Sequence, residues 1–363
     1  MWSRLNIAAR VRAWLMPRQA YVVSPPEGSL MCTNFKYPTA KDGTTCVGRT
    51  MEFPNEIPWQ IGVAASDMKG QCTLVPNGKT WQAKYGVVGM SAFNNPQWYA
   101  DGVNTAGLSA HILYMPDHAT YYDPKGDGTD IGILDLIAFT LGTCASVEEA
   151  KAAVMTVNVV NVNPKEIPIP LPTHLILHDK DSCAVLEFHP EGPKVSDNPV
   201  QVATNSPYLE WHLTNICNYL SFSPENPAPI TIGGTKFAAF AQGQGFRGLP
   251  GDSTSPSRFI RVLTDVRFAP QPAAQKDAEL QTIRVLHGYD ISTGTIEEAS
   301  PTGSGDIPEL TMWSTVSNLT GGRYMYNTYA DPQWYAIDLG TTDFTNSRSV
   351  AFAGSGGPMP LTV

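Results

Sequence analysis

One cysteine of this 363-residue sequence, Cys32 directly after Met31, has the neighbourhood of a nucleophile. If the chain is cut between these two residues, a thiol and a free α-amine lie on the same residue. The α-amine has a reference pKa near ~8 and can act as a base at neutral pH, and the thiolate is a strong nucleophile. A cysteine of this kind carries its own base and needs no histidine. The alternative interpretation is a structural thiol, because most cysteines are small buried hydrophobic residues.

The residues that follow predict a β-hairpin that brings charged side chains back to Cys32. The stretches 35–37 and 46–48 flank Asp42-Gly43, and Asp-Gly is a strong hairpin signal. The second strand continues through Arg49 and Glu52, so an antiparallel return places both side chains near Cys32. Without a reactive thiol the same two residues are an ordinary cross-strand ion pair.

The rest of the pattern predicts an α+β chain. Early hairpins, central helices and late strands are typical of helices that cover stacked sheets, and no change of composition marks a second domain after residue 32. A capping box, Ser146 to Glu149, opens one of the helices. We expect a second hairpin over residues 173–188, late strands at 324–329 and 334–338, and helices at 131–143, 150–157, 211–220, 259–268 and 277–287.

Composition excludes several classes of protein. The net charge of −9, without a basic stripe, argues against nucleic-acid binding, and no apolar run is long enough for a membrane span. The abundant Gly (31) and Pro (30) argue against a coiled coil. The six cysteines show no Cys-x-x-Cys spacing, which fits neither a zinc site nor a disulfide scaffold, so we expect mostly reduced, buried thiols. Cys144 and Cys217 fall in expected helices and are assigned to the core.

The first 31 residues differ from the rest, because four arginines (4, 10, 12 and 18) precede the first acidic residue, Glu27. Three interpretations stay open: a removed propeptide, an Arg-rich targeting peptide, or a start codon misassigned upstream of Met31. We expect residues 1–31 to lie outside the fold and residues 32–363 to form one domain. The protein is cytoplasmic if Met31 is the true start, and periplasmic or otherwise targeted if a leader is removed.

Further short stretches extend the pattern around Cys32. They are residues 48–52 (GRTME), 101–108 (DGVNTAGL), 204–207 (TNSP) and 248–261, which ends in Ser257-Arg258-Phe259-Ile260-Arg261. Taken singly, 204–207 is typical of a helix start capped by Asn or Ser, and 249–252 of a plain turn. In this order, and with 326–329 (YNTY) and 336–338 (AID), they resemble the choloylglycine hydrolase family of N-terminal-nucleophile hydrolases. The resemblance runs from Cys32 to about Asp338.

The resemblance implies a role for each matching residue around the thiol. Cys32, freed at its amine, is the nucleophile, and Arg49 is the cation beside it, which would lower the pKa of the thiol. Glu52 occupies a position that is Asp in well-known members, where the carboxylate accepts a hydrogen bond from the α-amine. The longer side chain is a departure from the family pattern and affects the geometry at the amine.

The oxyanion hole and the support of the nucleophile follow in the same way. The resemblance implies that the side-chain amide of Asn205 and the backbone N–H of Tyr114 stabilise the oxyanion. Arg258 matches an arginine that helps to hold the nucleophile region, whereas Arg261 is read as a surface charge. Bile acid hydrolases tend to have Asn at the position of Tyr114, and penicillin V acylases Tyr.

The family implies a four-layer αββα sandwich and hydrolysis of linear non-peptide amides without a metal or cofactor. Tyr114 favours penicillin V acylase-like activity, on penicillin V or N-acyl homoserine lactones, and the alternative is a conjugated bile acid hydrolase. An alternative of another class is a non-catalytic binding protein whose Cys32 amine stays blocked. The expected partner is a small acyl amide, and members are often homotetramers. His174 and His178 share a strand face, but no further ligand has metal-site spacing, so we assign them structural roles.

Overall fold

Two antiparallel sheets stacked face to face form the centre of the protein. The computed structural model describes residues 21–22, 31–53, 57–162, 164–166, 171–299 and 306–354. The first sheet has the order β16 (Val202–Ala203), β2 (Cys32–Lys36), β3 (Cys46–Phe53), β20 (Asp306–Asn318), β21 (Arg323–Thr328), β22 (Tyr335–Asp338), and β19 (Ile296–Ala299) also pairs with β20. The second has the order β15 (Gly192–Asp197), β14 (Cys183–His189), β13 (Thr173–His178), β9 (Ser109–Tyr114), β8 (Tyr99–Asn104), β7 (Val87–Ala92), β4 (Trp59–Ala64), β23 (Arg348–Val350).

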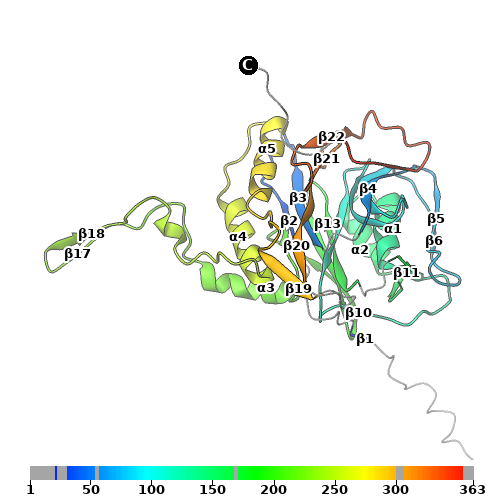
Figure 1. The fold of residues 1–363 in the computed structure, drawn as a ribbon, viewed down its shortest axis with the longest axis horizontal. Coiled ribbons are helices and arrows are strands. Elements are labelled where there is room, and N and C mark those ends of the chain that lie inside the picture. Colours follow the sequence, from blue (N-terminus) through cyan, green and yellow to red (C-terminus); the bar gives the residue numbers. More distant parts are fainter. Residues whose placement is uncertain are drawn as a thin grey trace, which may run out of the picture.

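Helices cover the outer face of each sheet. Helices α4 (Ser255–Phe268) and α5 (Gln275–Leu286) pack on the first sheet, against β2, β3, β16 and β20. Helices α1 (Ile133–Thr143) and α2 (Val147–Val154) pack on the second sheet, against β7, β8, β9, β13 and β14. Figure 1 shows the resulting order of helices, sheet, sheet and helices. The expected four-layer αββα arrangement is therefore confirmed.

The helices lie where the sequence predicts them, with different ends. The capping box of α2 is present, because the backbone N–H of Glu149 donates to Ser146 Oγ at 3.2 Å. Residue 131 belongs instead to the short strand β11 (Asp130–Gly132), which pairs in parallel with β12 (Asn158–Val160). The helix expected at 211–220 is α3 (Leu209–Asn215), followed by one 3₁₀ turn (Ile216–Tyr219).

Two expectations about the segment around α3 are wrong. The residue that caps α3 is Tyr208, and neither Asn205 nor Ser206 caps it, because Asn205 is turned toward Cys32. Cys217 is exposed rather than part of the core, since the 3₁₀ turn carries it at the surface. Cys144 and the other four cysteines are buried free thiols, as expected.

A long excursion leaves the four layers after α3. Its hairpin consists of β17 (Ile230–Ile232) and β18 (Thr235–Phe237), which pair only with each other. Figure 1 shows this hairpin far from the sheets, at the left of the view. The large apolar residues Ile230, Ile232, Phe237 and Phe240 are exposed there.

Other short elements complete the described part of the chain. The two-residue strand β1 (Tyr21–Val22) pairs with β10 (Thr120–Tyr121), and β5 (Lys69–Gln71) pairs with β6 (Thr80–Gln82). A 3₁₀ turn covers Gln244–Phe246. None of the described helices has the length and apolar content needed to cross a lipid bilayer.

Candidate active site

The hairpin of β2 and β3 brings the expected charged residues to Cys32. Cys32 lies opposite Met51, and Asn34 lies opposite Arg49, in an antiparallel hairpin as the sequence predicts. Cross-strand partners share one face of a sheet, so the Cys32 thiol and Arg49 both point into the space between the two sheets. Glu52 is one residue on from Met51 and therefore lies on the other face, toward α4 and α5.

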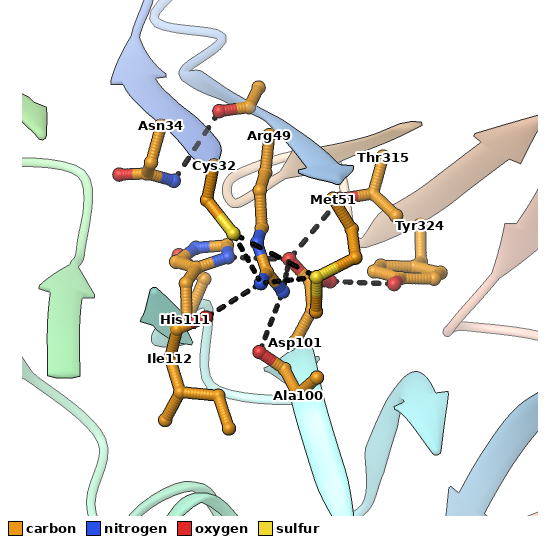
Figure 2. A network of polar contacts seen from close by, with 12 residues as sticks. Cys32, Asn34, Arg49, Met51, Ala100, Asp101, His111, Ile112, Thr315 and Tyr324 are labelled. Atoms are coloured by element: carbon orange, nitrogen blue, oxygen red, sulfur yellow. Dashed lines mark hydrogen bonds and ion pairs between the residues drawn. The ribbon is translucent and has the colours of Figure 1, made fainter. Parts of the chain in front are cut away.

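Arg49 is fixed beside the thiol by the second sheet. Its Nη2 lies 3.7 Å from Cys32 Sγ, and its two terminal nitrogens donate to the carbonyl oxygens of Ala100 (2.7 Å) and Ile112 (2.6 Å), as Figure 2 shows. Burial raises the pKa of the Cys32 thiol above its usual value, and the Arg49 guanidinium opposes this rise. The expected effect of Arg49 is thus present but smaller than the effect of burial. The thiol in this chain keeps its proton at neutral pH and needs a base to lose it.

Asn205 and Tyr114 lie on either side of Cys32. The Asn205 Oδ1 accepts the backbone N–H of Cys32 at 2.8 Å, and its Nδ2 donates to the carbonyl oxygen of Tyr114 at 2.6 Å. The backbone N–H of Tyr114 donates to the Cys32 sulfur and lowers the pKa of the thiol, although less than burial raises it. One amide hydrogen of Asn205 and the N–H of Tyr114 are therefore both close to the reactive residue.

Arg258, from the first turn of α4, holds the backbone of the nucleophile. Its Nη1 donates to the carbonyl oxygen of Cys32 and, at 2.9 Å, to Thr33 Oγ1. Its Nη2 donates to Asn205 Oδ1 at 2.6 Å. One buried guanidinium thus links the strand that carries Cys32 to the loop that carries Asn205.

Glu52 lies close to Cys32 but has other partners. Its backbone N–H donates to the carbonyl oxygen of Met31 at 3.1 Å, and its Oε1 accepts from Thr311 Oγ1 at 2.9 Å. Burial raises the pKa of this carboxyl to about 7, against the opposing effect of Arg258. The α-nitrogen of Cys32 is a peptide nitrogen in this chain and bonds to Asn205 instead.

A narrow apolar pocket of about 30 Å³ opens at Cys32. Met51, Phe53, Trp59, Ile112 and Leu134 are among the residues that line it, and Tyr114 and Glu52 form part of its wall. The surroundings of the thiol on this side are therefore mostly apolar.

A family model described as linear amide C–N hydrolases, choloylglycine hydrolase family, matches residues 32–352. The chain belongs to the choloylglycine hydrolase family. It is a hydrolase of linear amide C–N bonds, as the sequence resemblance predicts.

Curated relatives of this choloylglycine hydrolase are named for bile salts. The bile salt hydrolase/transferase of Clostridium perfringens is 33% identical over 320 residues, which cover 85% of this chain and 92% of the relative. The bile salt hydrolase/transferase of Lactiplantibacillus plantarum is 29% identical over 270 residues, which cover 74% of this chain and 82% of the relative. These names favour the bile acid hydrolase alternative over the penicillin V acylase-like interpretation that Tyr114 suggests.

Solved structures agree with the fold. A variant of the conjugated bile acid hydrolase from Clostridium perfringens matches with a TM-score of 0.78 and 28% identity, over 90% of this chain and 99% of that one. The penicillin V acylase from Agrobacterium tumefaciens matches with a TM-score of 0.70 and 22% identity, over 86% of this chain and 88% of that one, and supports the fold alone.

The sequence missed two groups of site residues in this hydrolase. Asp101 and His111 lie behind Arg49 on the second sheet; the sequence singled out the stretch that begins at Asp101 but gave that residue no role, and His111 belongs to none of the stretches. Glu309 accepts the backbone N–H of Met31 at 2.7 Å from β20, a strand that was not expected. A count of strand faces would have placed Arg49 and Glu52, three residues apart, on opposite sides of β3.

The histidines on β13 have protein partners. His174 Nε2 lies 2.9 Å from the carbonyl oxygen of Thr204, and His178 Nε2 lies 2.7 Å from Asn34 Oδ1. Within the described ranges, no three His, Cys, Asp or Glu side chains gather in a way that could hold a metal ion.

Glu52 gives a first testable prediction. We expect Glu52→Gln to lower kcat sharply and change KM little, because a neutral amide cannot stabilise the protonated α-amine that forms during the reaction. Glu52→Asp is expected to retain substantial activity, since it keeps the charge. Steady-state kinetics measures both, with Glu279→Gln as the control, a buried carboxylate of α5 that pairs with Arg323. Wild-type rates in Glu52→Gln would mean that the carboxylate is only structural.

Proposed function

We propose that Cys32 is the nucleophile of this amide hydrolase and that its own α-amine is the base. The observation that carries the proposal is the convergence of Arg49, Asn205 and the Tyr114 N–H on one buried cysteine at the mouth of an apolar pocket. These groups supply a cation and oxyanion donors but no side-chain base. The α-nitrogen, 2.8 Å from Asn205 Oδ1, is in place to fill that role.

The reaction then runs in two halves. The α-amine takes the proton of the Cys32 thiol, and the sulfur attacks the amide carbonyl. The Asn205 Nδ2 and the Tyr114 N–H stabilise the oxyanion, while Arg258 keeps the Cys32 backbone fixed. The protonated amine donates its proton to the leaving nitrogen, and water then hydrolyses the acyl-thioester.

The substrate class that we propose is the conjugated bile acids, with glycine or taurine as the leaving amine. The names of the relatives support this choice, and the residues around Cys32 are mostly apolar, as the acyl group of such a substrate is. A hydrolysis screen tests it with glycine- and taurine-conjugated bile acids, penicillin V and N-acyl homoserine lactones. Faster hydrolysis of penicillin V or of the lactones would favour the second candidate, the penicillin V acylase-like activity that Tyr114 supports.

Maturation is part of the proposal: the active chain begins at Cys32, residues 1–31 are absent from it, and residues 32–363 are the catalytic domain. The physical reason is that an acylated nitrogen is neither basic nor able to relay a proton. We expect N-terminal sequencing and intact mass of active protein to give Cys32 as the first residue. Active protein that begins at Met1 would contradict this.

An unprocessed, inactive protein that still binds acyl amides would favour the other class, a binding protein with a blocked amine. Calorimetry with a bile acid conjugate, together with the intact mass, separates the two classes. A chain that already begins at Cys32 and binds the conjugate without hydrolysing it would contradict both hypotheses: that Cys32 is the nucleophile, and that the protein is inactive because its amine is blocked.

We also propose that the hydrolase is a homo-oligomer, a tetramer by analogy with the family. The hairpin β17–β18 supports this, because it exposes Ile230, Ile232, Phe237 and Phe240 away from the core. A second copy of the chain would remove this apolar surface from water. Sedimentation of the purified full chain at the mass of one chain would contradict it.

A further inference from the structure

The guanidinium of Arg49 lies between the Cys32 thiol and the carboxylate of Asp101. On one side its Nη2 is 3.7 Å from Cys32 Sγ, and on the other its Nη1 is 3.8 Å from Asp101 Oδ2. Both charged side chains are completely buried. Figure 2 shows the guanidinium between the sulfur and the carboxylate. Charges in such a low-dielectric place interact far more strongly than charges at a surface.

The surroundings of Asp101 stabilise its ionised form. His111 Nδ1 lies 2.5 Å from its Oδ2, the Tyr324 hydroxyl donates to its Oδ1 at 2.6 Å, and Thr315 Oγ1 donates to Oδ2 at 3.2 Å. Burial alone would raise the pKa of this carboxyl. The combined effect of His111, Arg49 and the Tyr324 hydroxyl is larger and opposite, so the pKa lies below its usual value. The carboxylate therefore carries its negative charge at neutral pH.

Arg49 does not need Asp101 to stay in position. The carbonyl oxygens of Ala100 and Ile112 accept hydrogen bonds from its two terminal nitrogens. The separation of 3.8 Å between Arg49 and Asp101 is longer than a hydrogen bond. What Asp101 adds is a negative charge next to the guanidinium, in addition to the Cys32 sulfur on its other side.

We propose that Asp101 is the counter-ion of Arg49 and limits the attraction of this cation for the Cys32 sulfur, so that the thiol keeps its proton until the α-amine takes it. Asp101 is thus a positioning residue, which acts on the nucleophile through Arg49. The inference rests on the proposed function, in which Cys32 is the nucleophile and its amine the base. A permanently ionised thiol would leave the amine without a proton to take from it.

Other charged and titratable groups also surround the pair and must be constant in any test. They come from both sheets and from α4: Glu52 on β3, Arg258 on α4, His111 on β9, His178 on β13, Glu309 on β20 and Tyr324 on β21. A substitution at Asp101 alone changes none of these residues, and Asn in its place keeps one oxygen that can accept a hydrogen bond from Tyr324.

The test measures the thiol directly, without substrate. The rate at which iodoacetamide alkylates Cys32 is recorded against pH in mature protein, in a Cys217→Ser background, because Cys217 is the exposed cysteine. We expect Asp101→Asn to move the midpoint of this profile down by about one pH unit, since the attraction of Arg49 for the thiolate is then no longer shared with a carboxylate. Asp135→Asn, at a buried aspartate of α1, is the matched control and should leave the midpoint unchanged.

A double variant tests whether Asp101 acts through Arg49. In an Arg49→Met background, adding Asp101→Asn should leave the midpoint within the error of Arg49→Met alone. A midpoint that stays or rises in Asp101→Asn, or that falls equally in the presence and absence of Arg49, would overturn the proposal. If Asp101→Asn does not fold but the double variant does, the two buried charges depend on each other, which supports the counter-ion role, because removing both charges is tolerated better than removing one. An unfolded double variant would then count against the counter-ion role.

These outcomes are separate from those of the proposed function. Amide hydrolysis by the wild-type chain, and its absence in Cys32→Ala, tests the function. The alkylation profile tests Asp101 even if the substrate remains unidentified.

Discussion

Cys32→Ala is expected to abolish amide hydrolysis completely, and Cys32→Ser to lose nearly all of it. Alanine has no nucleophile, and the serine hydroxyl is far less acidic than the thiol and less nucleophilic. The fold should survive both changes, because the side chain is small and lies at the edge of an existing pocket. Steady-state rates on the best substrate of the screen, with circular dichroism as the check on folding, measure the effect.

Cys46→Ala is the matched control for this prediction. Cys46 is also a buried free thiol of the first sheet, at the far end of β3. We expect it to retain most of the wild-type rate. An active Cys32→Ala protein would refute the assignment of the nucleophile, whatever the other residues do.

Asn205→Ala is expected to lower kcat by about a hundred- to a thousandfold, or ~3–4 kcal/mol, the typical loss for one oxyanion donor. KM should change little, because the interaction is stronger in the transition state than in the bound substrate. Oδ1 of Asn205 also accepts from the Cys32 N–H and from Arg258, so the position of the α-nitrogen is lost at the same time. We therefore expect the upper end of that range.

Tyr114→Phe is the comparison that distinguishes backbone from side chain. The proposed donor is the Tyr114 N–H, which the substitution leaves in place, so we expect a much smaller loss than in Asn205→Ala. Kinetics of the two variants, measured side by side, decide the assignment. A larger loss of kcat in Tyr114→Phe would mean that the phenol itself takes part in the reaction.

The sequence predicted the β2–β3 hairpin and its consequence, the position of Arg49 beside Cys32. Local signals were sufficient there, because Asp42-Gly43 marks the turn between two strand-like stretches. The helices were equally visible, since apolar residues at helical spacing and the Ser146 cap depend only on neighbours in the chain. The four-layer fold came from the family resemblance, because local patterns indicated no more than stacked sheets under helices.

The strands of the second sheet were mostly missed for a physical reason. β7, β8 and β9 are buried at every residue, because the first sheet covers one face and α1 covers the other. Strands of this kind show no alternation of apolar and polar residues, which is the signal that identifies a strand. Asp101 and His111 lie on these strands, so the charge behind Arg49 could not be placed either.

The position of Met31 has a consequence for how the enzyme is switched on. Its N–H is bound by Glu309, its carbonyl oxygen by the Glu52 N–H, and only 5% of the residue is exposed. Proteases cut chain that is exposed and free of such hydrogen bonds. Once the first sheet has formed, the bond between residues 31 and 32 is therefore shielded from an external protease. Under the proposed maturation, a chain that folds before it is trimmed would thus remain a zymogen, and trimming would have to come before the first sheet closes or be carried out by the chain itself.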